Sequence, residues 1–339
     1  MDVVKKIYFY SYLYKCFKSV TRYLKSYKLK RILKYKKHFI FCCLLYLLWK
    51  LRNFTQKRYK NLIRINPNKK YLKTSFGNIA YIANNPINKK PKDLVILIHG
   101  FSGCSENMKK ISNVLVDNEY SVISFDCYGR GCSDATEYPN SPEVFCSMIS
   151  QALFTLQVKK KIHIVGYSMG GIIAGEFCKT FPHMVNTLTL LAPAGIDTHL
   201  PFVVRYCNFF PLGEIFVNMI GYMLLKKHYK ECSGKKTIAT GKVINLRKYH
   251  HNMKGYYSSL LSSVRNMPWE GYDYSSIKVR TYLIYSDADD IIDINKNNLC
   301  QFGEIEWEKM PGMSHSQLVS SKIGDRIVEF IEVPYRPII

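Results

Sequence analysis

The sequence predicts an α/β fold, in which helices cover both faces of a mostly parallel sheet. From residue 71 onward, short apolar runs of strand character alternate with stretches of helical spacing, a pattern that is typical of βαβ units. Some of these runs are continuously apolar, as "LVILI" is within residues 93–98, which favours strands buried on both faces. The alternation stops after Gly195, and this break indicates an inserted segment.

The expected elements follow in chain order. "TSFGNIAYIAN" (74–84) predicts a hairpin that turns at Gly77. Ser141 as N-cap and Pro142 at the first helical position indicate where one helix begins. Further strands are expected within residues 93–100, 120–129, 161–168, 186–195, 279–287 and 305–312, and further helices near 105–118, 142–158 and 169–180 and after residue 315.

Two regions depart from this alternation. Residues 196–272 contain apolar stretches with helical spacing, such as "LPFVVRYCNFF", so we expect a helical lid inserted into the main domain. Residues 1–70 are basic and rich in aromatic side chains. The predicted organisation is therefore an N-terminal segment over 1–70 and one α/β domain over 71–339.

The charge of the chain is concentrated at one end. Residues 1–70 hold 20 Lys and Arg against Asp2 alone, a net charge of +19 out of a total of +24. Nucleic-acid binding would favour basic and aromatic residues on a folded surface, so the sequence does not favour a nucleic-acid partner. The 11 cysteines are an odd number without a CxxC pair, which indicates buried thiols in a reducing compartment rather than a disulfide framework.

The N-terminal segment carries an apolar run, "FIFCCLLYLLW", at residues 39–49. Its eleven residues are fewer than the roughly 20 that cross a bilayer, and basic residues flank it on both sides. We expect this segment to hold an intracellular protein on an anionic membrane surface, with Cys16, Cys42 and Cys43 as candidate acylation sites. The alternatives left open are a helix that spans the membrane and a helix packed on the main domain.

Ser168 is the candidate nucleophile. It lies in the pattern G-x-S-x-G between a predicted strand and a predicted helix, with Gly166 and Gly170 as the small residues that a sharp turn requires. A serine needs a base to take its proton, and the base needs an acid to orient it. His315 follows the last predicted strand and is the expected base.

The expected acid comes from "DADDIID", which follows the strand at 279–287. Its spacing from the strand favours Asp289, with Asp287 as the alternative and Asp290 and Asp293 nearby. The order serine, aspartate, histidine along the chain fits this choice. No cluster of metal-ligating residues and no phosphate-binding loop is recognisable, so no metal or cofactor is expected.

Four motifs together resemble those of serine hydrolases with the α/β-hydrolase fold, most similar in character to monoacylglycerol lipases and lysophospholipase-like esterases. They are "HGFSG" (99–103), "DCYGRGCS" (126–133), "GYSMGG" (166–171) and the pair Asp289 and His315. The resemblance implies that the N–H groups of Phe101 and Met169 bind the oxyanion, and that the loop 126–133 is structural. Ser286 stands where such families usually have a glycine before the acid loop.

The expected function is therefore cleavage of carboxylic esters, above all lipid esters such as monoacylglycerol or lysophospholipid, through a Ser-His-Asp triad and an acyl-enzyme. The alternatives are a thioesterase or another small-molecule acyl hydrolase, and a non-catalytic binding scaffold built on the same fold.

Overall fold

The computed structural model describes residues 39–47, 68–87, 90–196, 198, 213, 217, 253, 255–294, 298–303 and 305–333. The chain divides into two compact units, Met1–Arg52 and Asn53–Ile339. In the first unit, residues 39–47 form a helix. In the second unit, the sheet begins at Lys69, two residues before the predicted start of the main domain.

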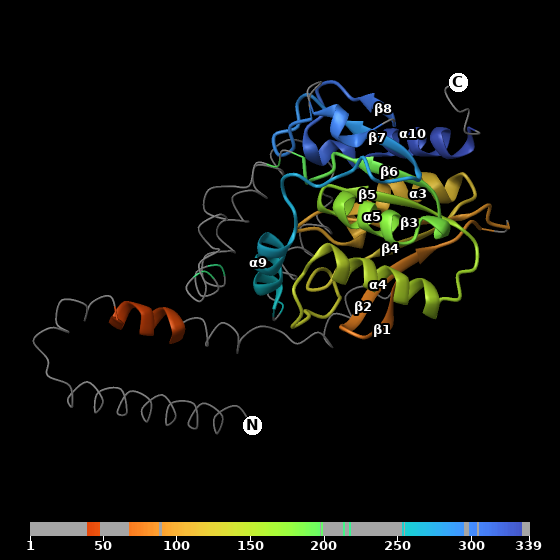
Figure 1. Cartoon of the computed structure of the whole chain (residues 1–339). Helices are drawn as coiled ribbons and strands as arrows, with labels where there is room; N and C mark the ends of the chain where they lie inside the picture. The colour runs from red at the N-terminus through yellow and green to blue at the C-terminus, as the bar shows by residue number, and fades with distance from the viewer. Residues whose placement is uncertain are drawn as a thin grey trace, which may run out of the picture. The chain divides into compact units, whose positions relative to one another are not determined.

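The second unit is built on one eight-stranded sheet with the order β1-β2-β4-β3-β5-β6-β7-β8 (Figure 1). The strands β1 and β2 form the predicted hairpin, in which Thr74 pairs with Gly77. Their bounds are β1 Lys69–Thr74, β2 Gly77–Asn84, β3 Leu94–Ile98, β4 Ser121–Phe125, β5 Ile162–Tyr167, β6 Val185–Leu191, β7 Arg280–Tyr285 and β8 Glu306–Lys309.

The sheet is mostly parallel, as the sequence predicts. β2 pairs antiparallel with β1 and with β4, whereas every pairing from β4 to β8 is parallel. Parallel neighbours need crossover connections, and helices provide most of them here. The carboxyl ends of the parallel strands consequently meet at one edge of the sheet, where the loops that follow them can form a site.

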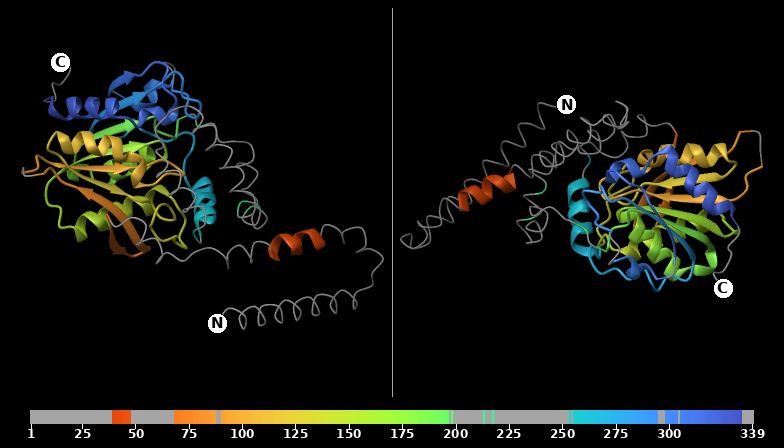
Figure 2. Two further views of the ribbon diagram at one scale, coloured as in Figure 1. Left: turned by 180° about the vertical axis from the view of Figure 1, so that it is seen from behind. Right: turned by 90° about the horizontal axis from the view of Figure 1, so that it is seen from above.

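Helices cover both faces of the sheet (Figure 2). The helices α4 (Pro142–Thr155) and α5 (Met169–Thr180) pack on one face, and α3 (Lys109–Asp117) and α10 (Ser321–Glu332) pack on the other. Side chains of β3 alternate between them: Ile96 and Ile98 belong to the core under α4 and α5, and Val95 and Leu97 belong to the core under α3 and α10. This period of two explains why the strand is apolar at every position.

The helix α9 (Tyr256–Asn266) lies apart from these two layers, as Figures 1 and 2 both show. It contacts the loops that follow β3 and β4, since Tyr256 Oη donates to the carbonyl of Ser102 and Ser259 Oγ donates to the carbonyl of Tyr128. The rest of the predicted lid over 196–272 lies outside the described residues, apart from residues 196, 198, 213, 217, 253, 255 and 267–272.

A buried cluster of charges joins the start of β1 to the loop after β4. The Lys69 ammonium, with a fully buried side chain, lies 2.9 Å from a carboxylate oxygen of Glu106 and forms an ion pair with Asp126. Asp126 also accepts hydrogen bonds from the N–H groups of Ser105 and Cys132, each at 2.7 Å. Burial by itself would raise the pKa of Asp126, but Lys69 and these two N–H groups outweigh it and lower that pKa.

Replacing Lys69 by methionine should destabilise the fold by about 3–5 kcal/mol, because the two carboxylates would stay buried without their counter-charge. Urea unfolding at neutral pH measures the change. The matched control is Lys70→Met, at an exposed position in the same strand, for which we expect a change within about 0.5 kcal/mol. An equal stability of the two variants would contradict this role of Lys69.

Candidate active site

Ser168 stands on a strained turn between β5 and α5. Its backbone angles are φ 55° and ψ −121°, a combination that residues with a side chain rarely adopt. The turn is held at its backbone: Ser168 N–H donates to the carbonyl of Leu191 at 2.9 Å, and its own carbonyl accepts from the N–H groups of Gly171 and Ala194. The serine side chain is thereby fixed at the carboxyl end of β5.

The two flanking glycines are required by close contacts of the turn. A Cβ atom at Gly166 would lie 2.3 Å from the carbonyl oxygen of Gly170. A Cβ atom at Gly170 would lie 2.4 Å from the carbonyl oxygen of Ile98 in β3. Both distances are shorter than any normal contact, so the turn can close against β3 only with glycine at these positions.

His315 and Asp289 form a hydrogen-bonded pair. His315 Nδ1 lies 2.7 Å from Asp289 Oδ2, and the aspartate side chain is only 1% exposed. The other oxygen, Oδ1, accepts from the N–H groups of Ile291 and Ile292 at 2.9 Å each. A carboxylate that accepts from Nδ1–H leaves Nε2 of the imidazole with its lone pair, the form that can act as a base.

The alternative acid, Asp287, contacts Lys309 and Gly312 and does not contact His315 within the described residues. Its carboxylate is 45% exposed, contacts Lys309 at 2.9 Å and accepts from the N–H of Gly312 at 3.0 Å. Asp290 and Asp293 are exposed as well. Of the four aspartates in this loop, the structure therefore brings Asp289 to His315.

Tyr167, the residue before Ser168, contacts His315. The Tyr167 hydroxyl donates to the carbonyl of His315 at 3.0 Å, and the two rings pack with centroids 4.9 Å apart. Ser168 Oγ and His315 are not hydrogen-bonded to each other within the described residues. Such bonds are commonly long in unliganded enzymes and close when substrate is bound. Sequence reasoning did not identify Tyr167, although its place in the motif was the available signal.

The two predicted oxyanion donors belong to the turn itself, at Met169, and to the loop after β3, at Phe101. Met169 is the first residue of α5, and the first N–H groups of a helix have no partner within the helix. The N–H of Phe101 makes no backbone hydrogen bond within the described residues. A Cβ atom at Gly100 would lie 3.2 Å from the Ser168 Cβ, so the loop that carries Phe101 passes directly beside Ser168.

His99 fixes the base of this loop, a role that sequence reasoning missed. Its Nδ1 lies 2.7 Å from the carbonyl of Gly100, and its Nε2 accepts from the N–H of Cys127 at 3.1 Å. A carbonyl only accepts and an amide only donates, so the ring is neutral with its proton on Nδ1. Complete burial lowers the pKa of His99 to about 4, which keeps the ring neutral at physiological pH.

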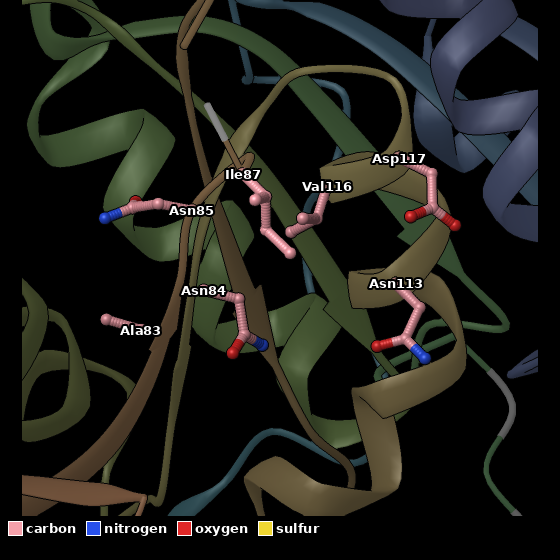
Figure 3. Close-up of a pocket in the computed structure, with 7 residues that line it drawn as sticks. All are labelled: Ala83, Asn84, Asn85, Ile87, Asn113, Val116 and Asp117. Carbon is pink, nitrogen blue, oxygen red and sulfur yellow. The ribbon is translucent and has the colours of Figure 1, made fainter. Parts of the chain in front are cut away.

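Two further features of the described residues were considered as sites: groups that could bind a metal ion, and a surface hollow. No group of His, Cys, Asp and Glu in the described part of the chain is placed to hold a metal ion. A hollow of about 330 Å³ lies between the end of β2 and α3 (Figure 3). None of the predicted site residues lines it, and its lining consists of Ala83, Asn84, Asn85, Ile87, Asn113, Val116 and Asp117.

Comparison with known proteins agrees with this architecture. Residues 93–210 match the family model of the alpha/beta hydrolase fold. The human protein named Monoacylglycerol lipase ABHD6 is 23% identical over 256 residues, which cover 71% of this chain and 75% of the relative. A Pseudomonas putida protein named 2-hydroxy-6-oxononadienedioate/2-hydroxy-6-oxononatrienedioate hydrolase 1 is 24% identical over 242 residues, covering 69% of this chain and 81% of the relative.

Among solved structures, carboxylesterase CesB (YbfK) from Bacillus subtilis superimposes with a TM-score of 0.65 at 16% identity, over 85% of this chain and 99% of that one. Three mycobacterial relatives, each 29% identical over 120 residues, are matched over only 34% of their own length. The chain has the α/β-hydrolase fold and resembles the monoacylglycerol lipase-like esterases.

The buried neutral His99 predicts a loss of stability in acid. Between pH 6.5 and about 4 the unfolded chain binds a proton that the folded His99 does not, so the free energy of unfolding falls as the pH falls, by up to about 1.4 kcal/mol per pH unit. The variant His99→Gln should lose this part of the slope in urea unfolding at several pH values. His183→Gln, at an exposed position, should keep it, and equal slopes in all three proteins would contradict the assignment.

Proposed function

We propose that the protein is a serine hydrolase that cleaves carboxylic esters, with lipid esters such as monoacylglycerol or lysophospholipid as its substrates. The observation that carries the proposal is the His315–Asp289 pair beside the strained turn at Ser168. An aspartate with two backbone N–H bonds on one oxygen and a histidine on the other is arranged to orient that histidine. The loop of Phe101 passes beside the same serine.

In the proposed reaction, His315 Nε2 takes the proton of the Ser168 hydroxyl as the oxygen attacks the acyl carbonyl. The negative charge that develops on the carbonyl oxygen is stabilised by the N–H groups of Phe101 and Met169. His315 then gives its proton to the leaving alcohol, and an acyl-enzyme remains on Ser168. Water, deprotonated by His315, attacks this ester, so that the carboxylic acid is released and the serine is regenerated.

A lipid ester is favoured by the relatives and by the residues around the oxyanion loop. The human relative is named a monoacylglycerol lipase and matches 71% of this chain. Beside the loop, the Phe101 ring packs edge-on against Trp269, with centroids 5.4 Å apart. Apolar side chains at this position suit an acyl chain better than a charged substrate.

A second candidate is the hydrolysis of a small, water-soluble substrate. The Pseudomonas putida relative, named a hydrolase of 2-hydroxy-6-oxononadienedioate, covers 69% of this chain and favours this reading. Rates measured with long-chain monoacylglycerol, lysophospholipid, acyl thioesters, short nitrophenyl esters and that dienedioate distinguish the two. A preference for long acyl chains supports the lipid proposal, and a preference for the dienedioate overturns it.

Two substitutions test the triad, and a third is the matched control. Ser168→Ala should abolish ester hydrolysis and covalent labelling by a fluorophosphonate, because the nucleophile is removed. Asp289→Asn should lower kcat by about 10⁴-fold, because the amide cannot hold His315 in the productive tautomer. Asp287→Asn, at the exposed aspartate two residues away, should stay within twofold of wild type.

The measurement is kcat with a short nitrophenyl ester, normalised to the concentration of folded protein. Full activity in Ser168→Ala would overturn the mechanism. Large losses in Asp287→Asn with none in Asp289→Asn would reassign the acid. A wild-type protein that turns over no ester and is not labelled would favour a binding scaffold.

We also propose that the N-terminal segment holds the protein on an anionic membrane surface. The helix at residues 39–47 is uncharged, and Phe39, Phe41 and Leu44 are each about half exposed. Among the described residues, no helix has the length and hydropathy needed to cross a bilayer. The exposed apolar side chains of this helix and the basic residues on both sides of it in the sequence support a position at the membrane interface.

The exposed Cys42 on this helix would be available for S-acylation, whereas Cys16 lies outside the described residues.

The double substitution Phe41→Glu and Leu44→Glu should weaken binding to vesicles of phosphatidylserine and phosphatidylcholine tenfold or more, since each apolar side chain contributes about 2 kcal/mol when buried. Co-sedimentation measures the effect. Ile87→Glu, at a loop residue that is 84% exposed, is the control, and unchanged binding of the double variant would contradict the proposal.

A further inference from the structure

Arg130 is a completely buried arginine in the loop that follows β4. Its guanidinium donates to four neutral oxygen atoms. Nε donates to the carbonyl of Phe101 at 3.1 Å, and one terminal nitrogen donates to the carbonyl of Tyr128 at 2.9 Å and to Ser259 Oγ at 3.0 Å. The other terminal nitrogen donates to Ser263 Oγ at 2.7 Å.

No carboxylate pairs with Arg130 within the described residues. Burial lowers its pKa to about 10, so the guanidinium remains charged at neutral pH. A buried charge without a counter-ion is costly, and a neutral side chain could donate to the same oxygens at a lower cost. An arginine at this position offers a planar geometry with five donors and a positive charge, which a neutral side chain does not.

The partners of Arg130 join two parts of the molecule. Phe101 belongs to the loop after β3, and Ser259 and Ser263 lie on α9, one turn apart. The guanidinium also lies over the Phe101 ring, with its central carbon 5.7 Å from the ring centroid. Arg130 therefore holds residue 101 through both its carbonyl and its ring, and it attaches the same residue to α9.

Two further contacts link α9 and its carboxyl end to the same loop. Tyr256 donates to the carbonyl of Ser102 at 3.2 Å, and Trp269, just beyond α9, packs on the Phe101 ring. The loop of Arg130 itself fits closely against α9, because a Cβ atom at Gly129 would lie 2.0 Å from Ser259 Oγ. These contacts leave little freedom for the loop 99–103 to move independently of α9.

We infer that Arg130 is a positioning residue that sets the oxyanion-binding N–H of Phe101 and couples it to α9, so that the oxyanion loop and this helix shift together. The inference rests on the proposed function, in which Phe101 binds the oxyanion. Because an oxyanion donor acts in the transition state, a displaced Phe101 lowers kcat and leaves KM nearly unchanged. The positive charge of Arg130 beside this residue favours the same negative transition state.

The test uses the full-length protein and compares Arg130→Lys with Arg280→Lys. Lysine keeps the charge but cannot make the forked contacts. Arg280, the first residue of β7, is the control. It also combines hydrogen bonds, to Glu306 and to the carbonyl of Val333, with a ring contact to Phe330, but its contacts are with β8 and α10 and not with the loop of Phe101. We expect Arg130→Lys to lower kcat about 10- to 100-fold per fluorophosphonate-titrated site with KM within twofold, and Arg280→Lys to change neither.

Hydrogen exchange supplies a readout that does not depend on activity. In Arg130→Lys, exchange should rise in peptides covering residues 99–103 and in those covering α9, and it should stay at the wild-type rate in both for Arg280→Lys. A purely structural role would lower the melting temperature and leave kcat per titrated site unchanged. That result, or exchange that rises in only one of the two segments, would overturn the inference.

If Arg130→Lys does not fold, Ser263→Ala tests the coupling instead, because it removes one hydrogen-bond acceptor of Arg130 on α9 and leaves the arginine in place. A fall of threefold or more in kcat with unchanged KM supports the coupling, and an unchanged kcat overturns it. Failure of the proposed function is distinguishable, because wild-type protein would then hydrolyse no ester and would not be labelled at Ser168. The exchange comparison would still report whether Arg130 couples the two segments.

Discussion

The strained turn at Ser168 is the constraint on which the rest of this site depends. A residue with φ 55° and ψ −121° persists only where its surroundings hold it, and here β6 and the loop after it bind its N–H and its carbonyl. The turn closes against β3 because Gly166 and Gly170 carry no side chain. This geometry places Ser168 next to the loop of Phe101 and, through Tyr167, next to the loop of His315. Three loops from different strands thus gather around one side chain.

Buried polar groups hold these loops in place. Lys69 neutralises Asp126 at the base of the loop after β4, His99 bridges that loop and the loop after β3 as a neutral ring, and Arg130 joins both loops to α9. Each of these groups is costly to bury unless its hydrogen bonds are satisfied. A site assembled from loops needs such support, since loops have no ladder of regular hydrogen bonds to fix them. The buried charges of this protein described above thus lie where they hold the loops around Ser168 in place.

The main features of the fold were predictable from the sequence because they depend on local patterns. The apolar runs of β3 to β7, the hairpin at Gly77 and the cap at Ser141 follow from periodicity and turn chemistry. The turn at Ser168 was predictable for the same reason, because its glycines are close in sequence. Spacing favoured Asp289 over Asp287 as the acid but could not decide between them. The decision depends on which carboxylate the folded loop directs toward His315. The partners of Arg130 lie up to 133 residues from it in the chain, so only tertiary structure reveals them.

The proposed chemistry requires that the oxyanion, the nucleophile and the base meet at one point. A crystal structure of the protein after reaction with a fluorophosphonate tests this requirement most directly. We expect phosphorus bonded to Ser168 Oγ, one phosphonyl oxygen within about 3 Å of the N–H groups of Phe101 and Met169, and His315 Nε2 within hydrogen-bonding reach of the serine oxygen. Phosphorus on another residue, or a phosphonyl oxygen that faces away from both N–H groups, would contradict it.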